Sequence, residues 1–368
     1  MAKTFGGRSF LATFALVFLA IAVLFVADTF LAKTERAESV VESARLFQQG
    51  RALMQRGENE EAIERIRDAI ATERGDRDYL RTLAQAQLAA GRTADAESTL
   101  TELLQSDSTD GLSNLIMARV LVKEGQFAEA ISYFHRAVYG RWNENPAQNQ
   151  LRTRFELIDL LAQHNSKEEL LAELLSVQDL ASHDLKLRAR LGRLFLLAGS
   201  PARSADVFRG ILHDATANAD AYAGLGEADF ARGDYRAAQR DFQTALRLAP
   251  DDQAARQRLN LCNDLLMLDP TVRGLGTAER FRRSLKLVEL TQNEAIQCVG
   301  QSPSPELRGL LEKAGAALKA RVSGTQQSEV SESNVDLAEQ LWQARKKGCK
   351  SPLTIDSPLS LVLSRLAQ

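Results

Sequence analysis

One pattern of small and large apolar residues returns every 34 residues along more than half of the chain. Its clearest copy places Gly226, Gly233, Ala238, Phe242 and Pro250 at fixed positions. The six copies occupy residues 43–76, 77–110, 111–144, 151–184, 185–218 and 219–252, and residues 145–150 interrupt the period before the fourth. A unit of this length cannot bury an apolar face alone, so neighbouring copies must stack into a solenoid.

Each position in the repeat has a structural role that predicts two helices and a turn. Small residues such as Gly226 and Ala238 let two helices approach closely, and Gly233 between them suits a turn with a positive φ angle. Phe242 fills the gap to the next hairpin, and Pro250 ends the second helix. The fourth copy lacks the turn glycine and the small residues. We expect its helices to form, and the sequence leaves open whether the superhelix bends there.

The repeat resembles the tetratricopeptide-repeat family, whose period is also 34 residues. The positions that match the signature of that family are Tyr222, Leu225, Gly226, Gly233, Tyr235, Ala238, Phe242, Ala245 and Pro250. The resemblance covers residues 43–252 and implies an all-α fold, a right-handed superhelical solenoid of about six helical hairpins. Aromatic residues make up only 6% of the chain, which also suits closely packed helices. Residues 253–268 are expected to form a closing helix over the last apolar face.

The N-terminal segment is predicted to cross a membrane. From Ser9 to Ala27 there are nineteen residues without a charge, which as a helix would span roughly 28 Å, close to the thickness of the bilayer core. We assign residues 10–31 as a transmembrane signal-anchor and residues 1–9 as a cytoplasmic segment. Lys3 and Arg8 precede the apolar stretch without any acid, so the positive-inside rule places the body outside the cytoplasm. The predicted location is the inner (plasma) membrane, single-pass, with a periplasmic body.

Signal cleavage followed by secretion is the alternative. Ala20-Ile21-Ala22 has the small-x-small form that a signal peptidase needs. Cleavage there would leave a new N-terminus beginning with Val23-Leu24-Phe25, which is poorly soluble. A retained anchor is therefore favoured, and both readings place the body outside the cytoplasm.

Residues 270–368 form a C-terminal region that lacks the repeat but has helical patterning. Ser304-Pro305-Glu306 starts a helix well, with proline in the first turn and an acid near the positive end of the helix dipole. Residues 323–331 are polar and are expected to form a flexible link. The predicted helices run from Thr277 to Cys298, from Pro305 to Val322, from a cap at Asn334 to Lys347, and from Pro358 to Leu366.

The three cysteines, Cys262, Cys298 and Cys349, contain no CxxC pair, so a zinc ribbon or a thioredoxin-like site is not expected. In an oxidising compartment Cys298 and Cys349 could form a disulfide. The alternative is two unrelated thiols.

The chain carries no motif for catalysis. It has no phosphate-binding loop, no HExxH and no GxSxG, and its four histidines have no partner at metal-ligand spacing. The formal net charge of −2 gives no overall attraction to nucleic acid. We predict that the chain is not an enzyme and has no cofactor, no metal and no nucleic-acid partner.

The family resemblance implies a concave groove lined by the first helix of each hairpin. Its candidate residues are Phe47, Arg51, Arg81, Gln85, Leu115, Arg119, Lys123, Phe155, Arg193, Glu227 and Phe230. The N-terminal half of this set is basic with apolar spots, which favours a protein or peptide partner with acidic groups. The competing interpretation is that these charges only solvate an exposed face.

These observations predict a membrane-anchored scaffold or assembly factor of the cell envelope that binds a partner segment in the groove. Two alternatives stay open: a chaperone-like holder of secreted proteins, and a regulatory accessory protein that faces the cytoplasm. An enzyme with its active site in residues 270–368 is a weaker hypothesis, because that region is short and carries no catalytic motif.

Overall fold

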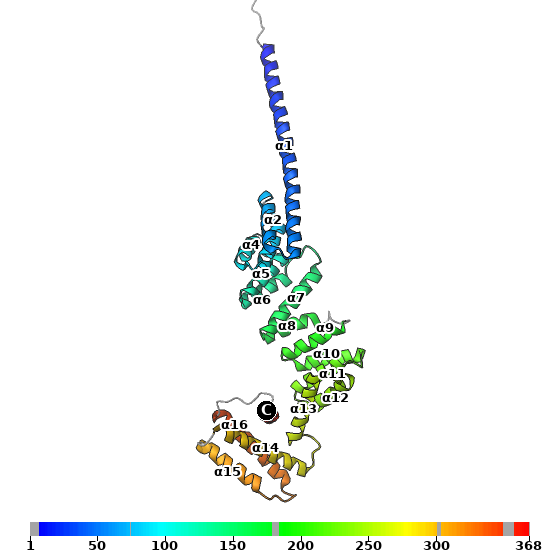
Figure 1. Cartoon of the computed structure of the whole chain (residues 1–368), viewed down its shortest axis with the longest axis vertical. Helices are drawn as coiled ribbons and strands as arrows, with labels where there is room; N and C mark the ends of the chain where they lie inside the picture. The colour runs from blue at the N-terminus through cyan, green and yellow to red at the C-terminus, as the bar shows by residue number, and fades with distance from the viewer. Residues whose placement is uncertain (1–6, 74, 179–183, 300–302, 349–356, 368) are drawn as a thin grey trace, which may run out of the picture. The chain divides into compact units, whose positions relative to one another are not determined.

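The computed structural model describes residues 7–73, 75–178, 184–299, 303–348 and 357–367 (Figure 1). These residues form seventeen α-helices and no strand, so the predicted all-α class is confirmed. The chain divides into two compact units, Met1–Leu160 and Leu161–Gln368.

The first unit contains the N-terminal helix and three complete hairpins. Its helices are α1 (Gly7–Arg56), α2 (Asn59–Thr72), α3 (Arg77–Ala89), α4 (Thr93–Ser106), α5 (Gly111–Lys123), α6 (Phe127–Val138) and α7 (Pro146–Gln163), the last of which reaches the unit boundary. In each hairpin the turn glycine adopts a left-handed conformation: φ is +82° at Gly57, +80° at Gly91 and +76° at Gly125. The predicted turn position is therefore correct in all three hairpins.

The second unit begins at Leu161 and continues the repeat. Its helices are α8 (Lys167–Val177), α9 (Leu185–Leu197), α10 (Pro201–Asp214), α11 (Ala219–Ala231), α12 (Tyr235–Leu248), α13 (Gln253–Leu268), α14 (Thr277–Val299), α15 (Pro305–Lys319), α16 (Gln327–Gly348) and α17 (Pro358–Leu366). Asn165 stands where the other repeats have glycine, and its φ of +55° keeps the turn. Asparagine is one of the few other residues that adopts this conformation, so the fourth turn survives the substitution.

The repeat positions build the core of both units. The small position of the second helix is fully buried where it holds Ala62, Ala96, Ala130 or Ala238. The large position is buried as well, in Ile66, Leu100, Phe134, Leu174, Phe208 and Phe242. The stacking of hairpins through these two positions is what the 34-residue period predicts.

Helix α1 is continuous from the apolar N-terminal segment into the first hairpin. Its C-terminal end lies antiparallel to α2 (Figure 1), and Ser43 Oγ donates a hydrogen bond of 3.0 Å to the carbonyl oxygen of Ala69 in α2. The apolar part has a mean hydropathy of 2.0 in its best 18-residue window and is not buried within the protein. By length and composition this helix could cross a membrane or serve as a signal sequence.

The C-terminal region differs from its predicted boundaries. Helix α16 begins at Gln327 and α15 ends at Lys319, so much of the expected polar link is helical. Asn334 is not a cap. It is 3% exposed inside α16 and donates a hydrogen bond of 3.1 Å to Ser284 Oγ in α14. A buried amide with a hydrogen-bond partner explains a polar residue at an internal helix position.

Helix α13 spans Gln253–Leu268, and its Ala255 and Cys262 form one buried cluster with Ala238 and Phe242 of the sixth hairpin. Leu265 and Leu268 join a cluster that extends through α14, α15, α16 and α17, together with Tyr235 of the sixth hairpin. The last repeat is therefore covered by the C-terminal helices as well as by α13.

Of the two cysteines in the predicted disulfide, the structure describes Cys298. Cys349 lies outside the described residues, so the Cys298–Cys349 disulfide stays a prediction. Cys262 is free and fully buried, and burial raises its thiol pKa to about 11. That thiol is protonated at neutral pH and is poorly reactive.

Candidate functional site

A cavity of about 640 Å³ opens on the second unit between the first helices of the fifth and sixth hairpins and α13. We call it the unit 2 cavity. Its apolar wall consists of Leu196, Leu197, Ala223, Phe208 and Phe242. A concave surface with an apolar wall and a few charged groups is the usual form of a binding site.

Glycines in the first helices bring Phe208 and Phe242 into this wall. A Cβ atom on Gly224 would lie 2.2 Å from Phe208 Cζ, and one on Gly192 would lie 2.8 Å from the same atom. A Cβ on Gly226 would meet the Phe242 ring at 2.9 Å. Each aromatic ring therefore occupies space that any side chain other than hydrogen would fill.

Charged residues surround the apolar wall. Arg193 of α9 is exposed, and no ion pair involves it among the residues that the structure describes. Glu227 of α11 accepts a hydrogen bond of 2.9 Å from Arg258 Nε of α13. Asp252 caps α13 by accepting from the Ala255 amide at 3.0 Å. In the unit 2 cavity Glu227 and Asp252 are therefore already bonded, Asp220 is exposed, and the Arg193 guanidinium is available to a ligand.

The basic groove residues predicted in the first unit are mostly occupied. Arg81 pairs with Asp78 and Asp110, the latter at 3.1 Å, and its side chain is only 11% exposed. Arg119 donates two hydrogen bonds of 2.9 and 2.7 Å to the carboxylate of Glu156. These pairs neutralise the basic half that the sequence suggested.

Several apolar groove candidates belong to the core. Phe47 is 8% exposed and stacks on Tyr79 with ring centroids 4.2 Å apart, and Leu115 is 4% exposed. Phe155 is half-buried. Phe230 packs against Tyr235, with ring centroids 5.2 Å apart. None of these side chains offers an open apolar surface.

The remaining polar candidates are scattered. Arg51 is exposed, with its guanidinium 5.9 Å from the centroid of the Phe47 ring, and Gln85 is half-buried. Lys123 donates a hydrogen bond of 3.4 Å to the Leu88 carbonyl. Of the predicted set, Arg193 and Glu227 line one cavity together.

The prediction missed several lining residues, three of which a helix-face analysis could have found. Leu197 follows Arg193 by four positions on α9, and Asp220 and Ala223 precede Glu227 by seven and four on α11. These spacings place each set on one helix face. Asp252 had no such signal, because it lies in the turn before α13.

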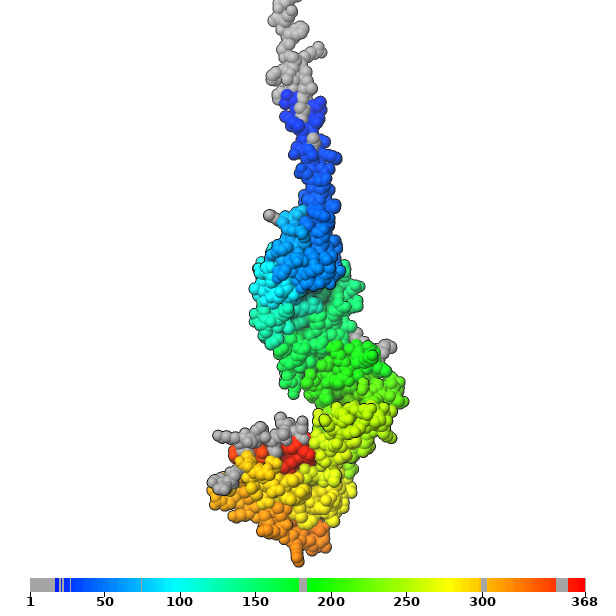
Figure 2. Space-filling view, viewed as in Figure 1, coloured from blue at the N-terminus to red at the C-terminus, as the bar shows by residue number. Residues whose placement is uncertain are grey.

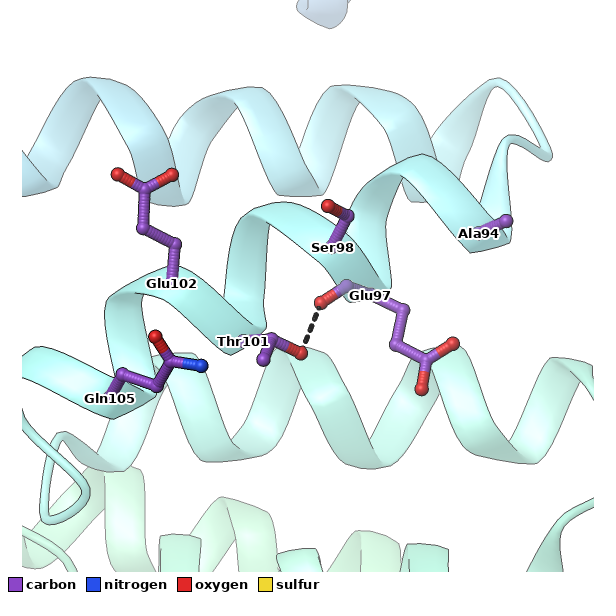
Figure 3. Close-up of a pocket in the computed structure, with 6 residues that line it drawn as sticks. All are labelled: Ala94, Glu97, Ser98, Thr101, Glu102 and Gln105. Carbon is purple, nitrogen blue, oxygen red and sulfur yellow. Dashed lines mark hydrogen bonds between the residues drawn. The ribbon is translucent and has the colours of Figure 1, made fainter.

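A second hollow, of about 410 Å³, lies on the first unit and offers little (Figure 3). All six residues that line it come from α4: Ala94, Glu97, Ser98, Thr101, Glu102 and Gln105. The Thr101 hydroxyl donates to the carbonyl oxygen of Glu97 in its own helix at 2.8 Å. No second element contributes a group, so this is the outer face of one helix. Across the described parts of both units, no group of three His, Cys, Asp or Glu side chains is placed to hold a metal ion.

Family models complete the description of the repeats. Models of the tetratricopeptide repeat match residues 47–111 and residues 219–252. The chain is a tetratricopeptide-repeat protein. The matched segments include parts of the first three hairpins and the whole of the sixth tetratricopeptide repeat. No curated protein matches the sequence.

Solved tetratricopeptide-repeat structures are similar over much of the chain. The C-terminal part of a repeat protein from Cytophaga hutchinsonii is 14% identical, covering 66% of this chain and 95% of that one at a TM-score of 0.46. YrrB, described as having an unusual peptide-binding site, is 18% identical (52% and 96%, TM-score 0.41). PilW, described as a type IV pilus biogenesis factor, is 16% identical (59% and 98%, TM-score 0.39). The tetratricopeptide-repeat fold indicates a general function in protein–protein interaction.

Proposed function

We propose that the chain is a membrane-anchored scaffold that binds a segment of a partner protein in the unit 2 cavity. The observation that carries this proposal is the cavity itself, where an apolar wall lies beside an exposed, unpaired Arg193. Two first helices and α13 supply its walls, so its shape depends on rigid elements. A binding site on packed helices is better preorganised than one on loops.

The lining residues favour a short segment with apolar side chains and one acidic group. Leucine and aromatic side chains of the partner would contact Leu196, Leu197 and Ala223, removing apolar surface from water. A carboxylate would complete the hydrogen bonding of Arg193. Because Glu227 is already paired with Arg258, it repels such a group less than a free acid would.

The anchor in this proposal is α1. Its uncharged stretch is long enough for a bilayer, and its basic N-terminal flank favours a body outside the cytoplasm. In that compartment the scaffold would hold or assemble a complex of the cell envelope. A chaperone-like holder of secreted chains and a cytoplasm-facing accessory protein are the alternatives.

Site-specific photo-crosslinking in cells tests the cavity. A photoreactive amino acid replaces Ala223, which lines the unit 2 cavity, or Arg203, which is exposed on α10 and does not line it. The proposal expects a discrete crosslinked protein from position 223 only. A single product supports the scaffold, whereas a broad range of secreted chains supports the chaperone-like alternative.

Charge reversal then tests the role of the guanidinium. Arg193→Glu should reduce the crosslink from position 223 by roughly tenfold, as expected for a desolvated charge pair that becomes repulsive. Arg203→Glu is the matched control and should leave the crosslink unchanged. If both variants behave like the wild type, or if position 223 gives no product, the partner binds elsewhere.

A further inference from the structure

The part of α1 between the proposed membrane span and the first hairpin is uncovered. Phe30, at the end of the proposed span, is 68% exposed, Val41 beyond it is 69% exposed, and Figure 2 shows this stretch bare on the face in view. From Ser43 onward one side of α1 is buried, because Ser43 and Phe47 pack against the first hairpin. Apolar residues that continue along one helix outside a core indicate a missing partner.

These exposed residues have the spacing of a coiled coil. Five uncharged residues of this stretch follow one another at alternating steps of four and three positions. We call them the α1 seam: Phe30, Thr34, Ala37, Val41 and Ala44. All five side chains are exposed, including that of Ala44, which follows the buried Ser43. A spacing of 3.5 residues keeps one helix face against a partner helix over successive turns.

We propose that the α1 seam pairs with the same seam of a second copy of this chain, as a parallel two-stranded coiled coil next to the membrane. The parallel direction rests on the membrane anchor of the proposed function, because two copies inserted with the same topology run the same way. Binding at the unit 2 cavity is not required. Val23, in the apolar part of α1, continues the register of the seam toward the membrane.

The charges beside the seam select an identical partner. Lys33 precedes the seam residue Thr34, and Glu38 follows the seam residue Ala37. In a parallel coiled coil, a residue directly before such a seam position, as Lys33 is, faces the residue five places further along the other helix. Lys33 of each copy therefore faces Glu38 of the other, which gives two symmetric ion pairs.

Both side chains are available for this pairing. Among the described residues, no ion pair within the chain involves Lys33 or Glu38. The neighbouring Arg45, in contrast, already donates to Glu42 of its own chain at 2.8 Å. The complementary pair is thus the one that the folded monomer leaves unused.

The expected dimer is reversible. The α1 seam is short, and Ala37 and Ala44 bury little area, although their size lets two backbones approach closely. Confinement of both copies to one membrane raises their effective concentration and offsets the weak contact. The contact therefore depends on the density of the protein in the membrane.

Disulfide crosslinking of the full chain in membranes tests the pairing. Ala37→Cys places a thiol on the seam, and Ala32→Cys makes the same change on an exposed position outside it. Oxidation should give a dimer of twice the chain mass with Ala37→Cys and no more than the wild-type background with Ala32→Cys. The wild-type lane accounts for the native cysteines, of which Cys262 is buried.

Charge exchange identifies the occupant. In the Ala37→Cys chain, Lys33→Glu or Glu38→Lys alone should lower crosslinking roughly three- to tenfold, because each replaces two attractions with two repulsions. Lys33→Glu together with Glu38→Lys should restore it. Glu35→Lys, which lies off the seam, is the matched control and should have no effect.

Three results would overturn the proposal: equal crosslinking from Ala32→Cys and Ala37→Cys, no restoration in the double variant, or a product whose mass shows a different protein. Failure of the anchor is detected separately, because alkaline carbonate would then release the chain from membranes.

Discussion

At the scale of single residues, glycine at two helical positions has opposite consequences for stability. Gly224 lies in the interior of α11 against the fully buried Phe208 ring, whereas Gly309 in α15 has open space where its Cβ would stand. Glycine lowers helix stability through its backbone entropy, so alanine is preferred wherever it fits. Glycine-to-alanine substitution at these two positions therefore distinguishes the effect of core packing from the effect of helix propensity.

We expect Gly224→Ala to lower the thermal unfolding midpoint and Gly309→Ala to raise it. The clash of a new methyl group with Phe208 costs about 1–3 kcal/mol, which exceeds the gain of about 1 kcal/mol in helix propensity. Gly309→Ala has only the gain. Circular dichroism of the solubilised chain measures both midpoints, and an upward shift in both variants would contradict the packing argument.

Asp241 gives a residue-scale prediction for pH. Burial raises the pKa of this carboxyl from 3.8 to about 6, with a further contribution from the nearby Asp229. The other charges that act on it are Arg240, Arg209 and Asp234. Because the folded pKa exceeds the unfolded one, its stabilising contribution is complete below pH 3.8 and is lost as the pH rises through about 6.

Asp241→Asn should therefore unfold at a higher temperature than the wild type above pH 6, with the difference shrinking as the pH falls toward 3.8. Other acids titrate in both chains, so the difference between the two midpoints isolates this group. Midpoints measured across this pH range provide the test, and a constant difference would show that burial does not control the titration.

At the scale of helices, the sequence predicted what is periodic and missed what depends on distant contacts. The 34-residue period located the hairpins, because each turn and each small residue is needed locally. Asp110, the N-cap of α5, lies 29 residues from Arg81, and Glu156 of α7 lies 37 residues from Arg119, so no local pattern indicated these two partners. Asn334 was misread as a cap because its buried partner, Ser284, is 50 residues away.

Helix α17 depends on one such distant contact. Arg365 pairs with Asp269, which is almost completely buried, and donates to the Thr271 hydroxyl at 2.8 Å. Its guanidinium also lies 5.8 Å from the centroid of the Tyr235 ring. These contacts attach the helix to the end of α13 and to the sixth hairpin.

We expect Arg365→Ala to loosen α17 selectively. Leaving the buried carboxylate of Asp269 without this donor costs about 1–3 kcal/mol. Amide hydrogen exchange should accelerate in α17 and stay unchanged in α14 and in the fifth hairpin. Arg308→Ala, on the exposed side of α15, is the control. Uniform acceleration throughout the second unit would mean that α17 is part of a larger cooperative core.

At the scale of the whole molecule, the proposed anchor would determine the compartment in which the chain works. The retained-anchor proposal expects the protein to stay with membranes after alkaline carbonate extraction and to keep the residues before Val23. Mass spectrometry of the purified protein checks this directly. A soluble protein that begins at Val23 would instead establish signal cleavage.

The thiol state reports on the compartment. With the body outside the cytoplasm, Cys298 and Cys349 should be oxidised together, and denaturation without reductant should expose one reactive thiol, that of the buried Cys262. Three reactive thiols would favour the cytoplasm-facing alternative.

The unbroken course of α1 has a mechanical consequence. A flexible tether would let the first hairpin touch the bilayer, whereas a continuous helix acts as a rigid spacer. Residues 32–42, between the proposed span and the first hairpin, correspond to about 16 Å of helix at 1.5 Å per residue. If the preceding apolar stretch lies in a membrane, the first hairpin is held at about that height and cannot turn without turning the span. In that case a partner that engages this hairpin would have to project above the membrane surface by a comparable distance.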